Sequence, residues 1–199
     1  MRWTKQWIVW AWFTGGGLQA QPVEVSRYDL EQGLPQSMVN HVLQDADGFI
    51  WLGTGDGLAR FDGTRFVVYK HDPRDSTSIA DNSIWGIAEA DPDHLWVGTR
   101  GNLERLDRRT GRFERMRIGS RKGVNGCWQP IHTGPNRSVF YSPLTVETLT
   151  IEGGDHQRMP TGHQASYCLR MSEDGRMLHS ICFPDSLITT DLVTGEESW

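Results

Sequence analysis

Short runs of apolar and β-branched residues alternate with turn-forming residues along most of the chain. Within residues 38–69, four such runs are separated by breaks at 45–48, 55–57 and 62–63. Aspartate accepts hydrogen bonds from its own turn and glycine tolerates positive φ, so these breaks indicate tight turns. Four short runs joined in this way predict an antiparallel four-stranded meander.

The same pattern recurs 45 positions later along the chain. Trp51 corresponds to Trp96, and each tryptophan is followed at the same distance by a Gly-Thr pair. The apolar and acidic positions of residues 58–62 recur at 103–107. A fixed period of this size is typical of repeat architectures, and four strands in about 40–45 residues make one blade of a β-propeller.

Two further copies follow, with weaker similarity. The third is found by aligning Phe140 with Trp96, and the fourth by a gap-free match between residues 187–195 and 103–111. The chain is therefore predicted to be all-β, a propeller of four-stranded antiparallel blades with about four blades present. The predicted blades comprise residues 34–69, 79–118, 124–159 and 165–199.

The N-terminal segment 1–20 differs in kind from the repeats. Arg2 and Lys5 precede an apolar run at 7–13, and small residues follow up to Ala20. This order is that of a signal peptide, and the apolar run is shorter than the roughly 20 residues that span a bilayer. An amphipathic helix is the alternative. Since no other stretch is apolar enough to span a membrane, the mature chain is expected to be exported, and so periplasmic or secreted.

Residues 21–33 are expected to lead into the first blade. Within them, residues 23–28 alternate as a short strand that belongs to no predicted blade. Propellers commonly close when an N-terminal strand completes the sheet of the last blade, which removes an open edge. Residues 23–28 are therefore predicted to form such a clasp strand.

Composition and motifs argue against several classes of function. The 199 residues carry a formal net charge of −5, so the basic footprint of a nucleic-acid-binding protein is absent. The three cysteines are too widely spaced for a zinc knuckle. Residues 45–48 imitate the start of a calcium loop but lack its distal glutamate, and neither HExxH nor GxSxG occurs. We expect no metal, no cofactor and no enzymatic activity in this chain.

The stretch 45–63, DADGFIWLGTGDGLARFDG, strongly resembles the two-component regulator propeller repeat, and residues 96–107 are a second good match. Residues 28–35 look like the usual approach to the first blade in this family. The resemblance implies a signal peptide, seven-bladed periplasmic propellers, a membrane helix and a cytoplasmic histidine-kinase or other signalling output. Several members of the family sense carbohydrates or their breakdown products.

The resemblance implies more blades than this chain contains. We therefore expect an incomplete propeller, the N-terminal part of a longer protein, which would pack against the missing remainder or a second chain. A closed four-bladed propeller is the alternative.

Positions that differ between the copies are candidates for ligand binding. In the front part of the fourth copy, the turn at 173–175 repeats the first turn. Four of these positions are then equivalent and are expected on the innermost strands, near the central channel: Asn40, Trp85, Gln129 and Tyr167. Amide and aromatic groups suit the hydroxyls and faces of a sugar. Arg100, in a loop, is a candidate for binding an anionic group. Ordinary variation in a water-lined channel and a solvated surface arginine are the alternatives.

Trp51 and Trp96 are instead predicted to pack between neighbouring blades, because a repeated large apolar residue fills the same gap in each copy. The function expected is an extracytoplasmic ligand-sensing module of a two-component-type protein, for a carbohydrate or similar small ligand. One alternative is a propeller glycan hydrolase or lyase, which would need a carboxylate pair facing the channel. Another is a structural protein-interaction propeller.

Overall fold

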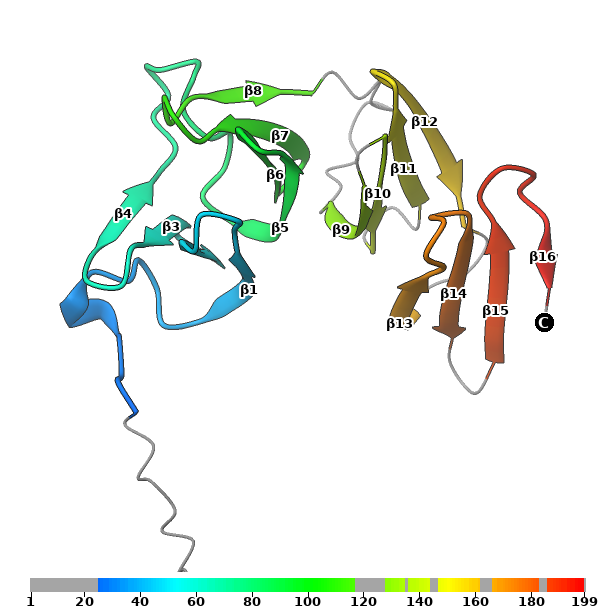
Figure 1. Cartoon of the computed structure of the whole chain (residues 1–199), viewed down its shortest axis with the longest axis horizontal. Helices are drawn as coiled ribbons and strands as arrows, with labels where there is room; N and C mark the ends of the chain where they lie inside the picture. The colour runs from blue at the N-terminus through cyan, green and yellow to red at the C-terminus, as the bar shows by residue number, and fades with distance from the viewer. Residues whose placement is uncertain are drawn as a thin grey trace, which may run out of the picture.

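The computed structural model describes residues 25–116, 128–134, 136–143, 147–161, 166–182 and 186–198. Its regular structure is one short 3-10 helix, η1 (Leu30–Gln32), followed by four antiparallel sheets of four strands each (Figure 1). Each sheet takes four strands that are consecutive in the chain, in the order of the sequence. The prediction of an all-β chain made of four-stranded meanders is confirmed.

The sheets are numbered here in chain order. Sheet 1 contains β1 (Val39–Gln44), β2 (Ile50–Thr54), β3 (Gly57–Phe61) and β4 (Phe66–Tyr69). Sheet 2 contains β5 (Ile84–Asp91), β6 (His94–Thr99), β7 (Asn102–Asp107) and β8 (Phe113–Arg115). Sheet 3 contains β9 (Gln129–Thr133), β10 (Arg137–Ser142), β11 (Glu147–Glu152) and β12 (Asp155–Pro160). Sheet 4 contains β13 (Ser166–Met171), β14 (Met177–Cys182), β15 (Ser186–Asp191) and β16 (Glu197–Ser198).

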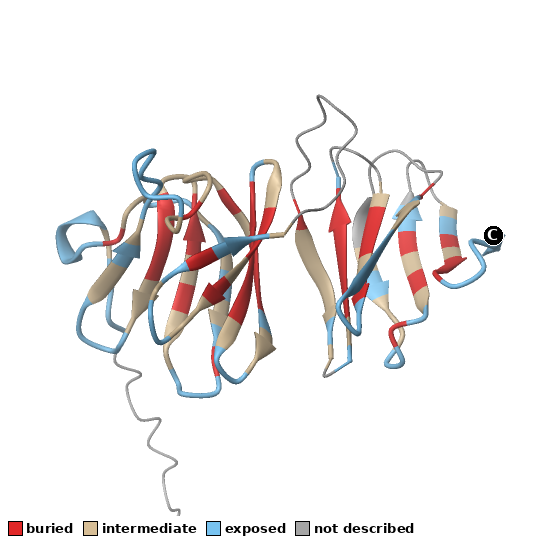
Figure 2. Cartoon of the chain, turned by 90° about the horizontal axis from the view of Figure 1, so that it is seen from above, coloured by how far each residue is buried: buried red, intermediate tan, exposed pale blue. Residues whose placement is uncertain are grey.

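The sheets follow one another like the blades of a propeller. The first strand of each sheet lies beside the first strand of the next, so that β1 contacts β5, β5 contacts β9, and β9 contacts β13. The buried positions lie along the strands, between successive sheets, while the turns at both ends are largely exposed (Figure 2). Each sheet is thus stabilised by burying its faces against its neighbours.

The repeated tryptophans pack between blades, as predicted. Trp51 of sheet 1 is fully buried in a core that includes Leu95 and Phe113 of sheet 2. Trp96 of sheet 2 lies in the next core, where its ring meets Phe140 of sheet 3 edge to face at 5.6 Å between centroids. The two indoles therefore fill corresponding gaps between successive sheets.

The turns repeat along with the strands. The Asp107 carboxylate accepts hydrogen bonds from the backbone of its own turn, and Asp191 does the same at the corresponding turn of sheet 4. In both turns a glycine N–H, from Gly111 or Gly195, donates to the aspartate carbonyl at 2.8 Å. The gap-free match predicted between the second and fourth copies is confirmed by this shared geometry.

Sheet 3 is shifted by one residue from the alignment that places Phe140 on Trp96. Trp96 faces the following sheet, but Phe140 faces back toward sheet 2, because the two share one core. Val139 faces sheet 4, where it shares a core with Leu178. Neighbouring residues of a strand face opposite sides, so Val139 takes the place that Trp51 and Trp96 take in their sheets.

The predicted clasp strand is not formed over its described part. Residues 25–29 are not in a strand, and Tyr28 instead packs its ring on Phe61 of sheet 1, at 4.6 Å between centroids. Residues 23–24 and the proposed signal peptide, 1–20, lie outside the described residues. Nowhere in the described ranges is there a helix with the length and apolar character that crossing a membrane requires.

Candidate functional site

Three of the predicted inner-strand residues occupy the same structural position. Asn40, Trp85 and Tyr167 are each the second residue of the first strand of their sheet, at an irregularity where the strand pairing shifts. The Asn40 side chain donates a 2.9 Å hydrogen bond to the carbonyl of Ile84, which ties sheet 1 to sheet 2. The enclosed Nε1 of Trp85 has no partner among the described residues.

Gln129 does not belong to this set, and its assignment is corrected here. It is paired with Tyr141 in the sheet, whereas its supposed equivalent Trp85 is unpaired. The shift in sheet 3 places the buried Trp128 at the position equivalent to Trp85 instead.

Arg100 lies exposed in the loop between β6 and β7, and its backbone N–H donates to the carbonyl of Ser83. No hydrogen bond or ring contact within the described residues joins any two of the five predicted site residues. The side chain of Tyr167 lies outside the part that can be described. The structure therefore places three of them on equivalent strand positions but does not assemble the five into one cluster.

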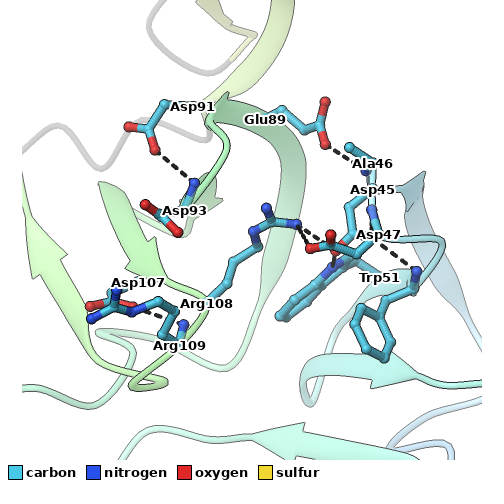
Figure 3. Close-up of polar contacts among 11 residues, drawn as sticks. Asp45, Ala46, Asp47, Trp51, Glu89, Asp91, Asp93, Asp107, Arg108 and Arg109 are labelled. Carbon is cyan, nitrogen blue, oxygen red and sulfur yellow. Dashed lines mark hydrogen bonds and ion pairs between the residues drawn. The ribbon is translucent and has the colours of Figure 1, made fainter.

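A buried polar network joins the β1–β2 turn of sheet 1 to the β7–β8 turn of sheet 2 (Figure 3). The Asp45 carboxylate, whose side chain is fully buried, accepts a 2.7 Å hydrogen bond from Nε1 of Trp51. Arg108 reaches across from the β7–β8 turn, with its Nη1 2.9 Å from Asp45 and 3.0 Å from Asp47. Burial raises the pKa of Asp45, but the bonds from Trp51 and Arg108 outweigh it and hold that pKa below its usual value.

This network leaves limited space between sheets 1 and 2. One cavity beside the network, lined in part by Asp47 and Arg108, has a volume of about 380 Å³. Another has a volume of about 330 Å³. It is lined by the residues of the network and by Phe49, over whose ring the Arg60 guanidinium lies at 4.7 Å. The contacts among Arg108, Asp45 and Trp51 thus fill much of the space between these two sheets, which is called a joint below.

The joint between sheets 2 and 3 is open at the corresponding end. A cleft of about 760 Å³ lies there, and residues of β5 to β8 face residues of the β9–β10 and β11–β12 turns across it. Its lining includes Trp96, Asp91, Arg105, Glu114, Ser138 and Gly153. A cavity of this size is within the range that holds small-molecule ligands.

One wall of the cleft carries a charged cluster. Nη2 of Arg105 lies 2.6 Å from the Asp91 carboxylate, whose second oxygen lies 2.7 Å from Nδ1 of His94. Burial raises the pKa of Asp91, but the bonds to His94 and Arg105 bring it down to about 2. Asp91 is therefore an anionic hydrogen-bond acceptor at neutral pH, and the charge of Arg105 is largely balanced by it.

The sequence analysis missed this cleft, although the pattern that marks it is present in the sequence. The position of Asp45 in the first copy is held by Ala90 in the second. The position after the third strand is Arg108 in sheet 2 and Gly153 in sheet 3. Comparing copies at these positions would have flagged the joint. Among the described residues, no group of three or more His, Cys, Asp and Glu side chains could hold a metal ion.

Comparison with known proteins identifies the repeats. Residues 33–56 and 78–101 match the family described as two-component regulator propeller. A relative named histidine kinase P4, from Formosa agariphila, is 52% identical over 48 residues. That match covers 24% of this chain but only 4% of the relative.

Solved structures with the same fold come from Bacteroides. The extracellular domain described as that of the hybrid two-component system BT3049 of B. thetaiotaomicron matches 87% of this chain, with a TM-score of 0.70 and 21% identity. That of BT4673 from the same organism matches 83%, with a TM-score of 0.62 and 16% identity. The chain covers 26% and 22% of these two structures. The chain thus contains two repeats that match the two-component regulator propeller model, and its fold is that of a β-propeller.

Proposed function

We propose that this chain is the ligand-sensing propeller of an extracytoplasmic, two-component-type signalling protein, with a carbohydrate or similar small polar molecule as its ligand. The observation that carries the proposal is the cleft between sheets 2 and 3. It combines a large indole, Trp96, with charged and hydroxyl groups in a hollow of about 760 Å³. An aromatic surface next to a few hydrogen-bonding groups is the usual composition of a small-molecule site.

The repeats support the signalling part of the proposal. They are of the two-component regulator type, and the relative that matches them at 52% identity is a histidine kinase. Because the chain spans 4% of that relative, a kinase or other output belongs in this proposal to a longer protein. The chain itself binds the ligand and carries out no chemistry on it.

Ligand binding is tested by thermal shift of the chain with a panel of neutral and acidic mono- and disaccharides. A saccharide that raises the unfolding temperature in a dose-dependent way supports the sensor, since a ligand that binds only the folded state stabilises it. The same panel is then analysed for products. Release of product would support the glycan hydrolase or lyase, and absence of any shift would favour a protein-interaction propeller.

Export is tested separately. Residues 1–20 are fused to alkaline phosphatase lacking its own leader, which is active only outside the cytoplasm. We expect activity, and we expect it to fall when Arg2 and Lys5 are both replaced by Glu, because a signal peptide needs a positive N-terminal region. An inactive fusion would contradict the extracytoplasmic location.

A further inference from the structure

We infer that the cleft between sheets 2 and 3 is the ligand site, and that a hydroxyl of an uncharged, polyhydroxylated ligand accepts a hydrogen bond from Nε1 of Trp96. This inference rests on the proposed function and adds the place and the chemistry of binding. It follows from comparing two joints of the same repeat, one of which is filled by protein side chains and the other of which is not.

The filled joint shows which groups surround the tryptophan when no ligand is bound. Between sheets 1 and 2, Nε1 of Trp51 donates to the Asp45 carboxylate, and Arg108 of the following sheet closes the space above that carboxylate. Asp45 reaches the indole from the turn between β1 and β2, and Arg108 reaches the Asp45 carboxylate from the turn between β7 and β8 (Figure 3). The Trp51 N–H and Nη1 of Arg108 both pair with the Asp45 carboxylate, while Nε of Arg108 is buried without a partner among the described residues.

The open joint lacks both of these partners. Ala90 stands at the position of Asp45, so no carboxylate side chain extends from it toward Trp96. Gly153 follows β11 where Arg108 follows β7, so that turn position carries no side chain, and the arginine that lines the cleft from sheet 3 is Arg137 of β10. The cleft is larger than either cavity beside the network of the filled joint, at about 760 Å³ against about 380 and 330 Å³.

Trp96 itself keeps the donor that Trp51 uses. The residue is 8% exposed, and no described residue accepts a hydrogen bond from its Nε1. That nitrogen is still accessible to solvent, so an acceptor in the cleft can reach it. An indole N–H in a nearly buried position gains from an acceptor, because leaving it unpaired costs desolvation energy.

The charges around the cleft favour a hydroxyl over a carboxylate as that acceptor. Arg105 is already paired with Asp91 at 2.6 Å, and Glu114 and Glu152 add two further carboxylates to the lining. Against them the lining adds Arg137, so its carboxylates still outnumber its guanidinium groups, and an anionic ligand would meet a net negative charge. A hydroxyl can accept from the indole N–H and donate its own proton to a neighbouring carboxylate.

The experiment is isothermal titration of the 199-residue chain with neutral disaccharides, namely maltose, cellobiose and lactose, and with D-glucuronate. Trp96→Phe removes the donor and keeps an aromatic ring. Ala90→Asp supplies a protein carboxylate at the position that Asp45 holds in the filled joint. Trp51→Phe is the matched control, because it makes the same chemical change in the joint that has no ligand.

We expect at least one neutral disaccharide to bind the wild type, and D-glucuronate to bind more weakly. Trp96→Phe should weaken binding by about 3- to 10-fold, the usual effect of losing one neutral hydrogen bond. Ala90→Asp should weaken it further, because its carboxylate occupies the indole N–H. Trp51→Phe should bind like the wild type.

Each departure from this result has a defined meaning. If Trp96→Phe and Ala90→Asp both bind like the wild type, the cleft is not the site, while the sensor function survives with a site elsewhere. Tighter binding of D-glucuronate than of the neutral sugars overturns the uncharged ligand. If the wild type binds none of the probes, the inference and the proposed function fail together. Should circular dichroism show that Trp96→Phe is unfolded, Ala90→Asp and Glu114→Gln decide the question.

Discussion

The indole N–H of Trp51 donates a 2.7 Å hydrogen bond to the carboxylate of Asp45, and both groups are buried. In the next copy of the repeat the tryptophan is retained and the aspartate is not. The same scaffold position therefore has two environments, one satisfied within the protein and one open to a ligand. Several measurable consequences follow from the difference between these two joints.

Replacing Asp45 with Ala should destabilise the fold by about 2–4 kcal/mol, because it leaves Arg108 and the Trp51 N–H without their buried acceptor. Arg108 is only 11% exposed, although its contact with Asp47 offsets part of the loss. The measurement is urea unfolding at pH 7, with Asp155→Ala, at an exposed position of β12, as the control. A loss below about 0.5 kcal/mol, the range of ordinary surface substitutions, would show that the network does not hold the joint.

The stability that Asp45 contributes should depend on pH in a defined direction. Its pKa is lowered in the folded state, so the contribution is present above the unfolded pKa and is lost as the pH falls through the folded one. Asp45→Asn should therefore lose less stability than the wild type between pH 5 and pH 3. Equal losses in the two proteins over that window would contradict the assignment.

Trp51→Phe should cost more stability than Trp96→Phe, by about 1–2 kcal/mol. The first substitution leaves the buried Asp45 carboxylate without one of its donors, whereas Trp96 has no partner to lose among the described residues. The comparison is made in parallel denaturant titrations of the two variants. Equal costs would mean that the ring volumes, and not the hydrogen bond, determine the difference.

Glu104→Gln should stabilise the protein at pH 8 and flatten its pH dependence. The Glu104 side chain is buried, and its carboxylate accepts hydrogen bonds from the backbone N–H of Ala80 at 2.9 and 3.2 Å. Burial raises its pKa to about 7, and the N–H of Ala80 and the charge of Arg115 only partly oppose this. Because the pKa is raised, stability is highest below pH 4.5 for this group and is lost as the pH rises toward 7.

The predicted gain for Glu104→Gln at pH 8 is at most about 3 kcal/mol, which corresponds to the raised pKa. Thermal unfolding of both proteins between pH 5 and pH 8 provides the measurement, with Glu114→Gln at an exposed site as the control. A wild type whose unfolding temperature does not fall from pH 5 to pH 8 relative to the variant would refute the raised pKa.

Gly98→Ala should destabilise the joint between sheets 2 and 3 by about 2 kcal/mol or more. An added Cβ would lie 1.8 Å from the carbonyl oxygen of Trp128, a backbone atom that moves only with its strand. Gly134→Ala is the matched control, because its nearest contact would be 3.4 Å away. Equal stability of the two variants in urea would indicate that sheets 2 and 3 do not approach this closely.

The tryptophans show most clearly which features could be predicted from the sequence alone. The 45-residue spacing of Trp51 and Trp96, with the turn residues around them, was enough to predict the four-stranded blades and the packing of the indoles between them. Both depend on local patterns, since turn chemistry and alternation act over a few residues. The family resemblance was found from the same residues.

Other features depended on contacts that the sequence pattern does not encode. The sequence alignment made Phe140 equivalent to Trp96, but Phe140 faces sheet 2 and packs against that indole. Gln129 is therefore not at the strand position that Asn40 and Trp85 occupy. The hydrogen bond between Asp45 and Arg108 joins residues 63 positions apart. The cleft between sheets 2 and 3 lies where the corresponding pair of side chains is absent.

The spacing of apolar and turn-forming residues over short stretches was enough to define the repeat, its strands and its turns. Which face of sheet 3 is buried, and which side chains pair with the buried Asp45 carboxylate, became clear only from the packing of successive sheets. These depend on how side chains from successive sheets fill a shared space, and in a close-packed interior a one-residue shift or one missing side chain changes that filling.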